Sequence, residues 1–302
     1  MERLAGRCEI REGGLDVTAE ELLDLARGVD AIVADPTVAV DEALLEAAGP
    51  TLRVVANFAV GYDNVDLEAC RRRGVAVTNT PDVLTNATAE LALALSLAAA
   101  RHLSEAAADL RSGRWRGFNP GAYLGVELSG ATFGVVGMGR IGRRYAELVA
   151  GFAGEILYTS RTRKDDAERE LGARHVPFDE LLRNADVVTL HLPATSETEG
   201  LVGAQQLSAM KPAAILVNAS RGPLVDSRAL ARALREGEIG AAGLDVYEHE
   251  PDVPMALLEA PHCVLLPHIG SATTRSRDGM ARLVADNVLA VLRGAEPPNR
   301  VA

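Results

Sequence analysis

Three glycines restrict the fold of this chain more than any other feature of its sequence. Gly137, Gly139 and Gly142 form G-x-G-x-x-G directly after the apolar segment TFGVV and directly before the helical segment RIGRRYAELVAGF. The first glycine permits a tight turn, the second lets a phosphate approach the backbone, and the third lets the helix pack against the strand. In this strand–turn–helix setting the pattern predicts a dinucleotide-binding site, although three glycines can also simply relieve a crowded turn.

Short β-branched runs and helical segments alternate on both sides of this turn. Three runs precede residue 81 (29–35, 52–58 and 74–80), and six follow residue 131 (132–138, 155–160, 186–192, 214–220, 242–247 and 263–267). A helical region at 86–112 separates the two groups, and an amphipathic helix is expected at 280–294. Alternation of this kind predicts two α/β units with parallel sheets, whose ligands bind at the carboxyl ends of the strands.

Charge and composition exclude several classes of protein. The 302 residues carry a formal net charge of −11, which is a poor match for nucleic acid because phosphate contacts need a basic face. The three cysteines are far apart and form no C-x-x-C pair, so neither disulfides nor a metal site is expected, and a reducing cytoplasm fits. The longest apolar run, at 91–100, is too short to cross a membrane.

A positive cluster follows the second strand of the glycine-turn unit. An acidic residue there usually bonds the adenosine ribose of NAD, whereas an arginine can pair with the 2′-phosphate of NADP. This chain has Ser160, Arg161, Thr162 and Arg163 at that place. The cluster therefore favours NADPH over NADH, and the alternative is a solvated loop without a ligand.

Ionisable side chains follow three later strands. Arg221 comes after one strand, Asp245, Glu248 and Glu250 come at or beyond the next, and His268 follows a third. Arginine can clamp a carboxylate, and a histidine oriented by a carboxylate can exchange the proton that accompanies hydride transfer. Spacing alone leaves Glu248 open as the rival of Glu250, and His191, which also ends a strand, as the rival of His268.

At these residues the sequence resembles the D-isomer-specific 2-hydroxyacid dehydrogenases over nearly its whole length. The matching segments are VGYDNVD, NTPDVLTNATAE, GMGRIG, HLPATSETEGLV, VNASRGPLVD, GLDVYEHEP and PHIGSAT, and the glyoxylate/hydroxypyruvate reductases are the most similar branch. The resemblance implies two doubly wound α/β domains. A flavodoxin-like substrate domain would comprise residues 1–97 and 276–302, and a Rossmann dinucleotide-binding domain would comprise residues 98–275.

The resemblance also implies roles for individual residues. Arg221, Glu250 and His268 would be catalytic. The substrate would be bound by Val60, Gly61, Arg221 and His268, and the first three of these would hold its carboxylate. The cofactor would be held by Thr88, Gly137, Met138, Gly139, Arg140, Ile141, Gly142, Ser160, Arg161, Thr162, Arg163, Leu192, Pro193, Thr198, Ala219, Ser220, Arg221, Asp245, His268 and Gly270.

The expected activity is reduction of glyoxylate or hydroxypyruvate to the 2-hydroxy acid with NADPH, or less favourably NADH, with His268 as general acid. Another D-2-hydroxyacid dehydrogenase, such as a phosphoglycerate dehydrogenase, and a non-enzymatic dinucleotide sensor like the family's corepressors are the alternatives.

The resemblance further implies a homodimer through the Rossmann domain, in which an aromatic side chain of the neighbouring subunit can reach the substrate. Trp115 and Phe118 lie in the segment that would supply this side chain. Phe118 stands where a tryptophan is common. Family members also usually open with an apolar strand that this sequence lacks, which could expose a neighbouring strand edge.

Overall fold

Two compact units account for the chain in the computed structural model, which describes residues 3–14 and 16–302. Unit 1 comprises residues 1–84 and 271–302, and unit 2 comprises residues 85–270. The expected first boundary, between residues 97 and 98, falls inside helix α4 (Thr85–Ala100), which belongs wholly to unit 2. The expected second boundary, between 275 and 276, falls inside helix α12 (Thr274–Leu292) of unit 1.

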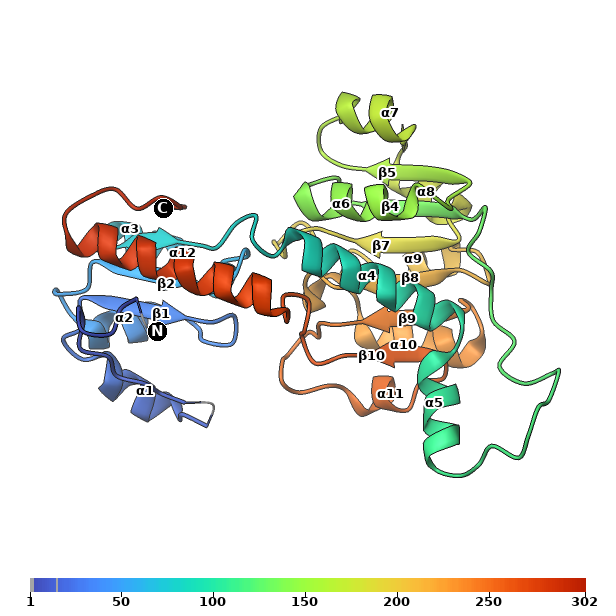
Figure 1. Ribbon diagram of the computed structural model, residues 1–302, viewed down its shortest axis with the longest axis horizontal. Helices are drawn as coiled ribbons and strands as arrows, with labels where there is room; N and C mark the ends of the chain where they lie inside the picture. Colours follow the sequence, from blue (N-terminus) through green and yellow to red (C-terminus); the bar gives the residue numbers. More distant parts are fainter. Residues whose placement is uncertain (1–2, 15) are drawn as a thin grey trace. The chain divides into compact units, whose positions relative to one another are not determined.

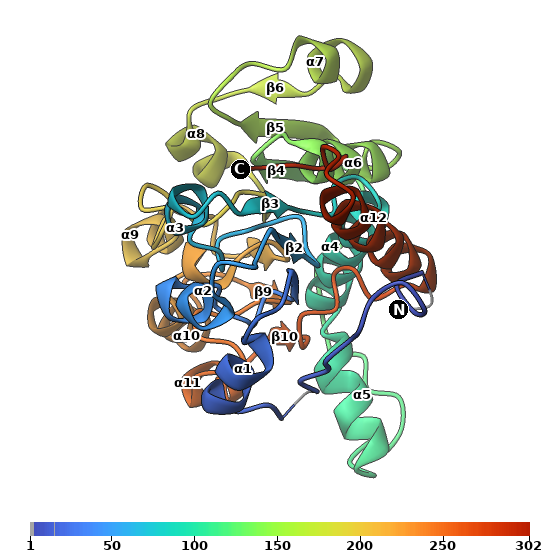
Figure 2. The ribbon, with the colours of Figure 1, turned by 90° about the vertical axis from the view of Figure 1, so that its left-hand side faces the viewer.

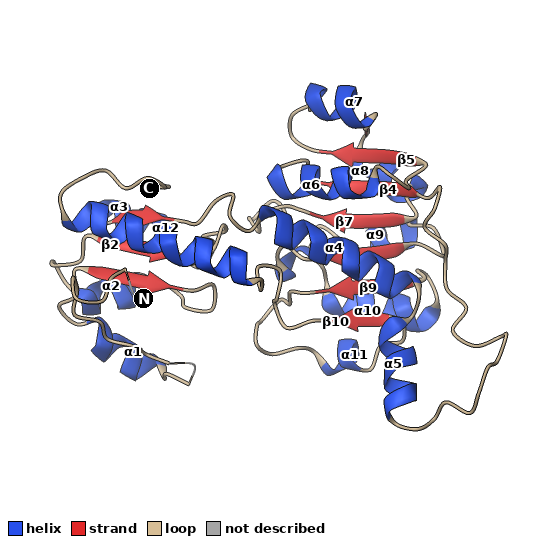
Figure 3. Ribbon diagram, in the orientation of Figure 1, coloured by secondary structure: helices blue, strands red, loops and turns tan. Residues whose placement is uncertain are grey.

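Unit 2 is built on a parallel sheet of seven strands in the order β10-β9-β8-β7-β4-β5-β6 (Figures 1 and 3). The strands are β4 (Thr132–Val136), β5 (Glu155–Thr159), β6 (Arg174–His175), β7 (Val187–Leu190), β8 (Ile215–Asn218), β9 (Ala241–Leu244) and β10 (Cys263–Leu265). The order reverses between β4 and β7, and in doubly wound sheets ligands bind at the carboxyl ends of the strands beside such a reversal. Strand β6 was not expected.

Helices cover both faces of this sheet. Helices α4 and α6 (Arg140–Val149) lie on one face, as Figure 1 shows, and pack on a core that includes Leu95, Phe133 and Tyr145. The other face is covered by α8 (Phe178–Asn184), α9 (Ala204–Ala209) and α10 (Ser227–Glu236). The remaining helices of unit 2 are α5 (Leu103–Arg111), α7 (Asp165–Leu171), the 3₁₀ turn η1 (Gly222–Leu224) and α11 (Met255–Leu258).

Unit 1 contains a smaller parallel sheet in the order β1-β2-β3. Its elements are α1 (Ala19–Ala26), β1 (Ala31–Ala34), α2 (Glu42–Ala48), β2 (Val54–Asn57), α3 (Leu67–Arg72), β3 (Ala76–Thr78) and α12. Successive side chains of strand β2 enter different cores on the two faces of the sheet. Val55 packs with α1, α2 and α3 on one face, and Val54 and Ala56 pack with α12 on the other (Figure 2). The predicted parallel α/β class is confirmed in both units.

The segment ahead of α1 forms turns and extended loops, and no strand occurs among its described residues. No helix in the described ranges is long and apolar enough to span a membrane.

Candidate active site

The glycine turn of unit 2 is held by close backbone contacts. Gly137 follows β4 with φ +98°, and a Cβ atom there would lie 2.5 Å from the carbonyl oxygen of His191. A Cβ on Gly142, inside α6, would collide with the carbonyl oxygen of Gly137. A Cβ on Gly139, at the N-terminus of α6, would meet nothing within 4 Å. The turn is therefore tightly packed on the protein side and open beside Gly139, which fits the approach of a pyrophosphate.

The loop after β5 contains the positive cluster expected there. The hydroxyl of Ser160 donates to the carbonyl oxygen of Thr162 at 2.6 Å, which folds the loop back on itself. The guanidinium of Arg163 pairs with Glu168 at 2.8 Å. Arg161 is exposed, and within the described ranges its side chain has no hydrogen bond or ion pair. Arg161 is therefore a cation of this loop that is available to an anionic ligand.

Three adjacent strands bring Arg221, Glu250 and His268 to one edge of the sheet. Strands β8, β9 and β10 are neighbours and parallel, so the segments after their last residues lie side by side. Nδ1 of His268 lies 2.6 Å from Oε2 of Glu250. The charge of Arg221 also acts on Glu250 and lowers the pKa of its carboxyl group.

The carboxyl group of Glu250 is kept ionised by its neighbours. Burial alone would raise its pKa, but several contacts outweigh burial and hold the pKa below its ordinary value of 4.5. The hydrogen bond with His268 contributes most to this lowering, followed by the hydrogen bond that the backbone N–H of Tyr247 donates at 3.0 Å. The carboxylate at 2.6 Å from Nδ1 orients the imidazole ring of His268.

Asp245 holds the loop that carries His268. Its buried carboxylate accepts hydrogen bonds from the backbone N–H groups of Ile269 at 2.8 Å and Gly270 at 2.7 Å. Burial raises the pKa of Asp245, while these N–H groups and the charge of His268 oppose that rise. The hydroxyl of Thr88, on α4, donates to the carbonyl oxygen of Gly270 at 3.2 Å. The expected cofactor contacts Thr88, Asp245 and Gly270 therefore form one buried cluster.

The two rival residues have different surroundings. Glu248 accepts a hydrogen bond of 3.4 Å from the backbone N–H of Ser227. Its carboxylate therefore contacts the first residue of α10 and not His268. Burial lowers the pKa of His191 to about 3, and its Nε2 lies 3.0 Å from the hydroxyl of Thr189. A histidine that stays neutral at physiological pH is not a source of protons.

The other expected cofactor residues lie in loops at the same edge of the sheet. Met138, Arg140 and Ile141 belong to the glycine turn and the first turn of α6. In the loop after β7, Leu192 lies beside Gly137, and Pro193 accepts a hydrogen bond of 2.8 Å from the hydroxyl of Thr198. Ala219 and Ser220 follow β8, where the side chain of Asn218 accepts hydrogen bonds from the N–H and the hydroxyl of Ser220.

Val60 and Gly61 lie in unit 1, in the loop after β2. Their carbonyl oxygens accept hydrogen bonds from the side chains of Asn79 at 2.8 Å and Asn57 at 2.6 Å, which fixes the loop. Their backbone N–H groups donate to no acceptor within the described part of the chain. The loop therefore presents two free amide donors.

Residues 93–270 match the family described as D-isomer specific 2-hydroxyacid dehydrogenase, NAD binding domain. The chain belongs to this family. The resemblance seen in the sequence is thereby confirmed, and a dehydrogenase of this family is an oxidoreductase that uses a nicotinamide cofactor.

Relatives support the same assignment over most of the chain. A glyoxylate reductase from Thermococcus litoralis is 51% identical over 284 residues, which are 93% of this chain and 86% of that protein. The crystal structure of a Thermus thermophilus protein has a TM-score of 0.91 and 44% identity, and the match covers 100% of this chain and 96% of the other.

An NADPH-dependent glyoxylate/hydroxypyruvate reductase from Sinorhizobium meliloti was solved with NADP and malonate. Its structure has a TM-score of 0.83 and 40% identity, and the match covers 96% of this dehydrogenase and 88% of that chain.

Two features of this dehydrogenase were not apparent from its sequence. Tyr247 makes two hydrogen bonds near the pair of Glu250 and His268. Its N–H donates to the carboxylate of Glu250, and its hydroxyl donates at 2.9 Å to the carbonyl oxygen of Leu266, two residues before His268. A second group, His102, Glu105 and His262, gathers elsewhere in unit 2. Neither feature has a spacing that marks it in the sequence.

Proposed function

We propose that the protein reduces a small 2-keto acid, glyoxylate or hydroxypyruvate, to the corresponding 2-hydroxy acid. The observation that carries this proposal is the pair of His268 and Glu250, with Arg221 nearby. These residues follow the carboxyl ends of neighbouring parallel strands, in a unit that binds a nicotinamide cofactor. The names of the relatives from Thermococcus litoralis and Sinorhizobium meliloti support this substrate class.

The residues at this edge supply what the reaction needs besides hydride. The reduced nicotinamide, when bound, supplies the hydride to the keto carbon. His268 donates a proton to the keto oxygen, and Glu250 stabilises the imidazolium form before that transfer. Arg221 binds the carboxylate of the substrate through its guanidinium.

For the amide donors of Val60 and Gly61, in unit 1, we propose binding of an anionic oxygen. Two N–H groups without acceptors on a fixed loop suit an anion, because backbone donors aimed at a negative oxygen need no reorganisation on binding. This role stays a prediction, and the roles of the cofactor residues named above also stay predictions.

The proposed cofactor is NADPH, because Arg161 is available where a carboxylate would favour NAD. The glycine turn fits the pyrophosphate of either cofactor, so the loop after β5 must decide between them. Ser160 contributes no negative charge that would repel a 2′-phosphate. Arg163, already paired with Glu168, is assigned a supporting role.

The decisive experiment follows the oxidation of NADPH and NADH by glyoxylate and by hydroxypyruvate, side by side, at 340 nm. Turnover with a clear preference for NADPH is the expected result. Turnover with 3-phosphohydroxypyruvate alone would favour the phosphoglycerate dehydrogenase alternative. Nucleotide binding without turnover of any keto acid would overturn the enzymatic proposal and favour a dinucleotide sensor.

We also propose that the protein forms a homodimer through unit 2. Helix α5 and residues 112–127 expose several large apolar side chains, with Phe118 at 92%, Leu124 at 72% and Trp115 at 56% of their surface. Exposed apolar side chains gathered in one segment are typical of a protein interface. Cytoplasmic location stays a prediction from the cysteine pattern.

A further inference from the structure

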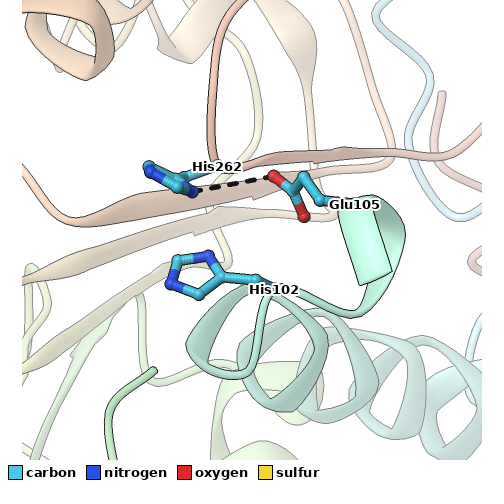
Figure 4. A group of neighbouring side chains, drawn as sticks. All are labelled: His102, Glu105 and His262. Atoms are coloured by element: carbon cyan, nitrogen blue, oxygen red, sulfur yellow. Dashed lines mark ion pairs between the residues drawn. The ribbon is translucent and has the colours of Figure 1, made fainter. Parts of the chain in front are cut away.

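Three potential metal ligands meet at the start of the edge strand β10. His102 lies between α4 and α5, Glu105 lies in the first turn of α5, and His262 directly precedes β10. One ligand atom from each residue lies within 4.8 Å of the others (Figure 4). The group belongs to unit 2 and shares no residue with the candidate active site.

Two polar atoms of this group are buried without a hydrogen-bond partner. Nδ1 of His102 and Oε2 of Glu105 have none within the described ranges. The ion pair between Glu105 Oε1 and Nδ1 of His262 is long, at 3.8 Å, and the two imidazole rings lie 4.3 Å apart at 51°. Buried polar atoms are nearly always satisfied, and a cation between these three side chains would satisfy both.

We propose that His102, Glu105 and His262 form a binding site for Zn²⁺. Two imidazoles and a carboxylate are ligands that zinc accepts, and a water molecule completes four-coordination when a protein supplies three ligands. Tetrahedral zinc with bonds of about 2.1 Å separates its ligand atoms by roughly 3.4 Å. Because the ligand atoms already lie within 4.8 Å of one another, only small side-chain movements are needed to reach this geometry.

Cys263, the residue after His262, is not among the ligand atoms that gather here. The group therefore offers two nitrogen ligands and one oxygen ligand.

The position of the site indicates a structural rather than a catalytic role. His262 precedes β10 and His268 follows it, so the two histidines are separated by up to ~20 Å along an extended strand. Zinc would fasten the junction of α4 and α5 to an edge strand that has a neighbour on one side only. Its effect is therefore expected on heat stability and not on glyoxylate turnover.

The test is titration of the metal-free full-length protein with Zn²⁺ against a chromophoric chelator. The variants are His102→Asn, Glu105→Gln and His262→Asn. Asparagine suits both histidine positions because their φ angles are +50° and +56°, and asparagine tolerates the left-handed region. His175→Asn removes a histidine at the opposite edge of the same sheet and is the matched control.

One Zn²⁺ per chain is expected in the wild type and in His175→Asn. Each of the three site variants should bind at least ~10- to 100-fold more weakly, since losing only a hydrogen-bond partner of a ligand already costs that much. Zinc should raise the melting temperature of the wild type but not of the site variants.

An anomalous diffraction peak between the three side chains should locate the ion. Absence of stoichiometric binding by the wild type, or equal binding by the site variants, would overturn the proposal. Circular dichroism of each variant separates loss of binding from loss of folding.

Discussion

At the scale of single residues, the contact between His268 and Glu250 determines which imidazole nitrogen can exchange a proton with the substrate. Nδ1 lies 2.6 Å from the carboxylate of Glu250, so Nε2 is the nitrogen left to exchange a proton. The N–H of Tyr247 holds the other oxygen of Glu250, which prevents that carboxylate from turning away. This geometry suits a general acid whose proton is replaced between turnovers.

Removal of His268 should therefore affect the chemical step. We expect His268→Ala to lower turnover of glyoxylate by ~10²–10⁴-fold, the usual contribution of a general acid. NADPH binding, followed by cofactor fluorescence, should remain nearly intact. Glu248→Gln is the control, because Glu248 contacts α10 instead, and unchanged turnover in His268→Ala would remove the histidine from the mechanism.

The lowered pKa of Glu250 also predicts how its contribution to stability varies with pH. A carboxyl group whose pKa is lower in the folded state stabilises that state above its unfolded pKa, here near the ordinary 4.5. This stabilisation is lost as the pH falls through the lowered value. The difference in unfolding free energy between wild type and Glu250→Gln should therefore be largest above about pH 4.5 and shrink at more acidic pH.

Urea unfolding of both proteins between neutral and acidic pH measures this difference. A gap that stays constant over the whole range would mean that Glu250 is not held ionised by its neighbours.

The two arginines after β5 should differ in their effect on the cofactor. Arg161→Ala is expected to raise the KM for NADPH by about 10- to 100-fold, since a hydrogen bond to a charged group contributes about 1.5–3 kcal/mol. The KM for NADH should not change, because NADH lacks the 2′-phosphate. Arg163→Ala should have a smaller effect, because Arg163 is paired with Glu168. Equal effects of Arg161→Ala on both cofactors would refute the phosphate contact.

At the scale of elements, the junction of β4 and α6 depends on the absence of one side chain. A Cβ on Gly142 would collide with the carbonyl oxygen of Gly137, so the helix could not start where it does. Gly142→Ala should destabilise the protein by about 1–3 kcal/mol and abolish nucleotide binding. Gly151→Ala is the control, because a Cβ there meets nothing within 4 Å. Thermal unfolding and NADPH fluorescence measure both effects, and a stable Gly142→Ala that binds NADPH would contradict the packing argument.

The sequence predicted elements well where a pattern was long and regular. The parallel α/β class is confirmed, as is the resemblance to the dehydrogenase family. Strand β6 has only two residues, Arg174 and His175, both exposed, so no apolar run announced it. The helical region at 86–112 divides into α4 and α5 because His102 adopts a left-handed conformation, for which a histidine gives no reliable signal.

The candidate site was predictable in part for similar physical reasons. Arg221 and His268 follow strong β-branched runs, so parallel topology alone brings them to one edge. Spacing could not separate Glu250 from Glu248, because the loop after β9 sets their directions. His102 and His262 are 160 positions apart and carry no shared motif, so only the folded chain reveals their proximity.

At the scale of the whole molecule, the exposed apolar side chains after α5 should control assembly. We expect Phe118→Asp and Leu124→Asp to convert a dimer into a monomer, because a buried carboxylate in an apolar interface is strongly unfavourable. Met255→Asp, at an exposed apolar position on α11, should not change the mass. Sedimentation velocity distinguishes these outcomes, and a wild type that sediments as a monomer would contradict the dimer.

The arrangement of unit 1 has a consequence for biosynthesis. Its sheet comes from the first part of the chain, but α12, which supplies Val284 and Val288 to the core over β2 and β3, is translated after all of unit 2. At ~5–20 residues per second, ribosomes need roughly 10–40 s for the intervening ~200 residues. During that interval an apolar sheet face lies uncovered on the nascent chain, which makes the N-terminal strands a natural substrate for chaperones while the inserted unit already folds.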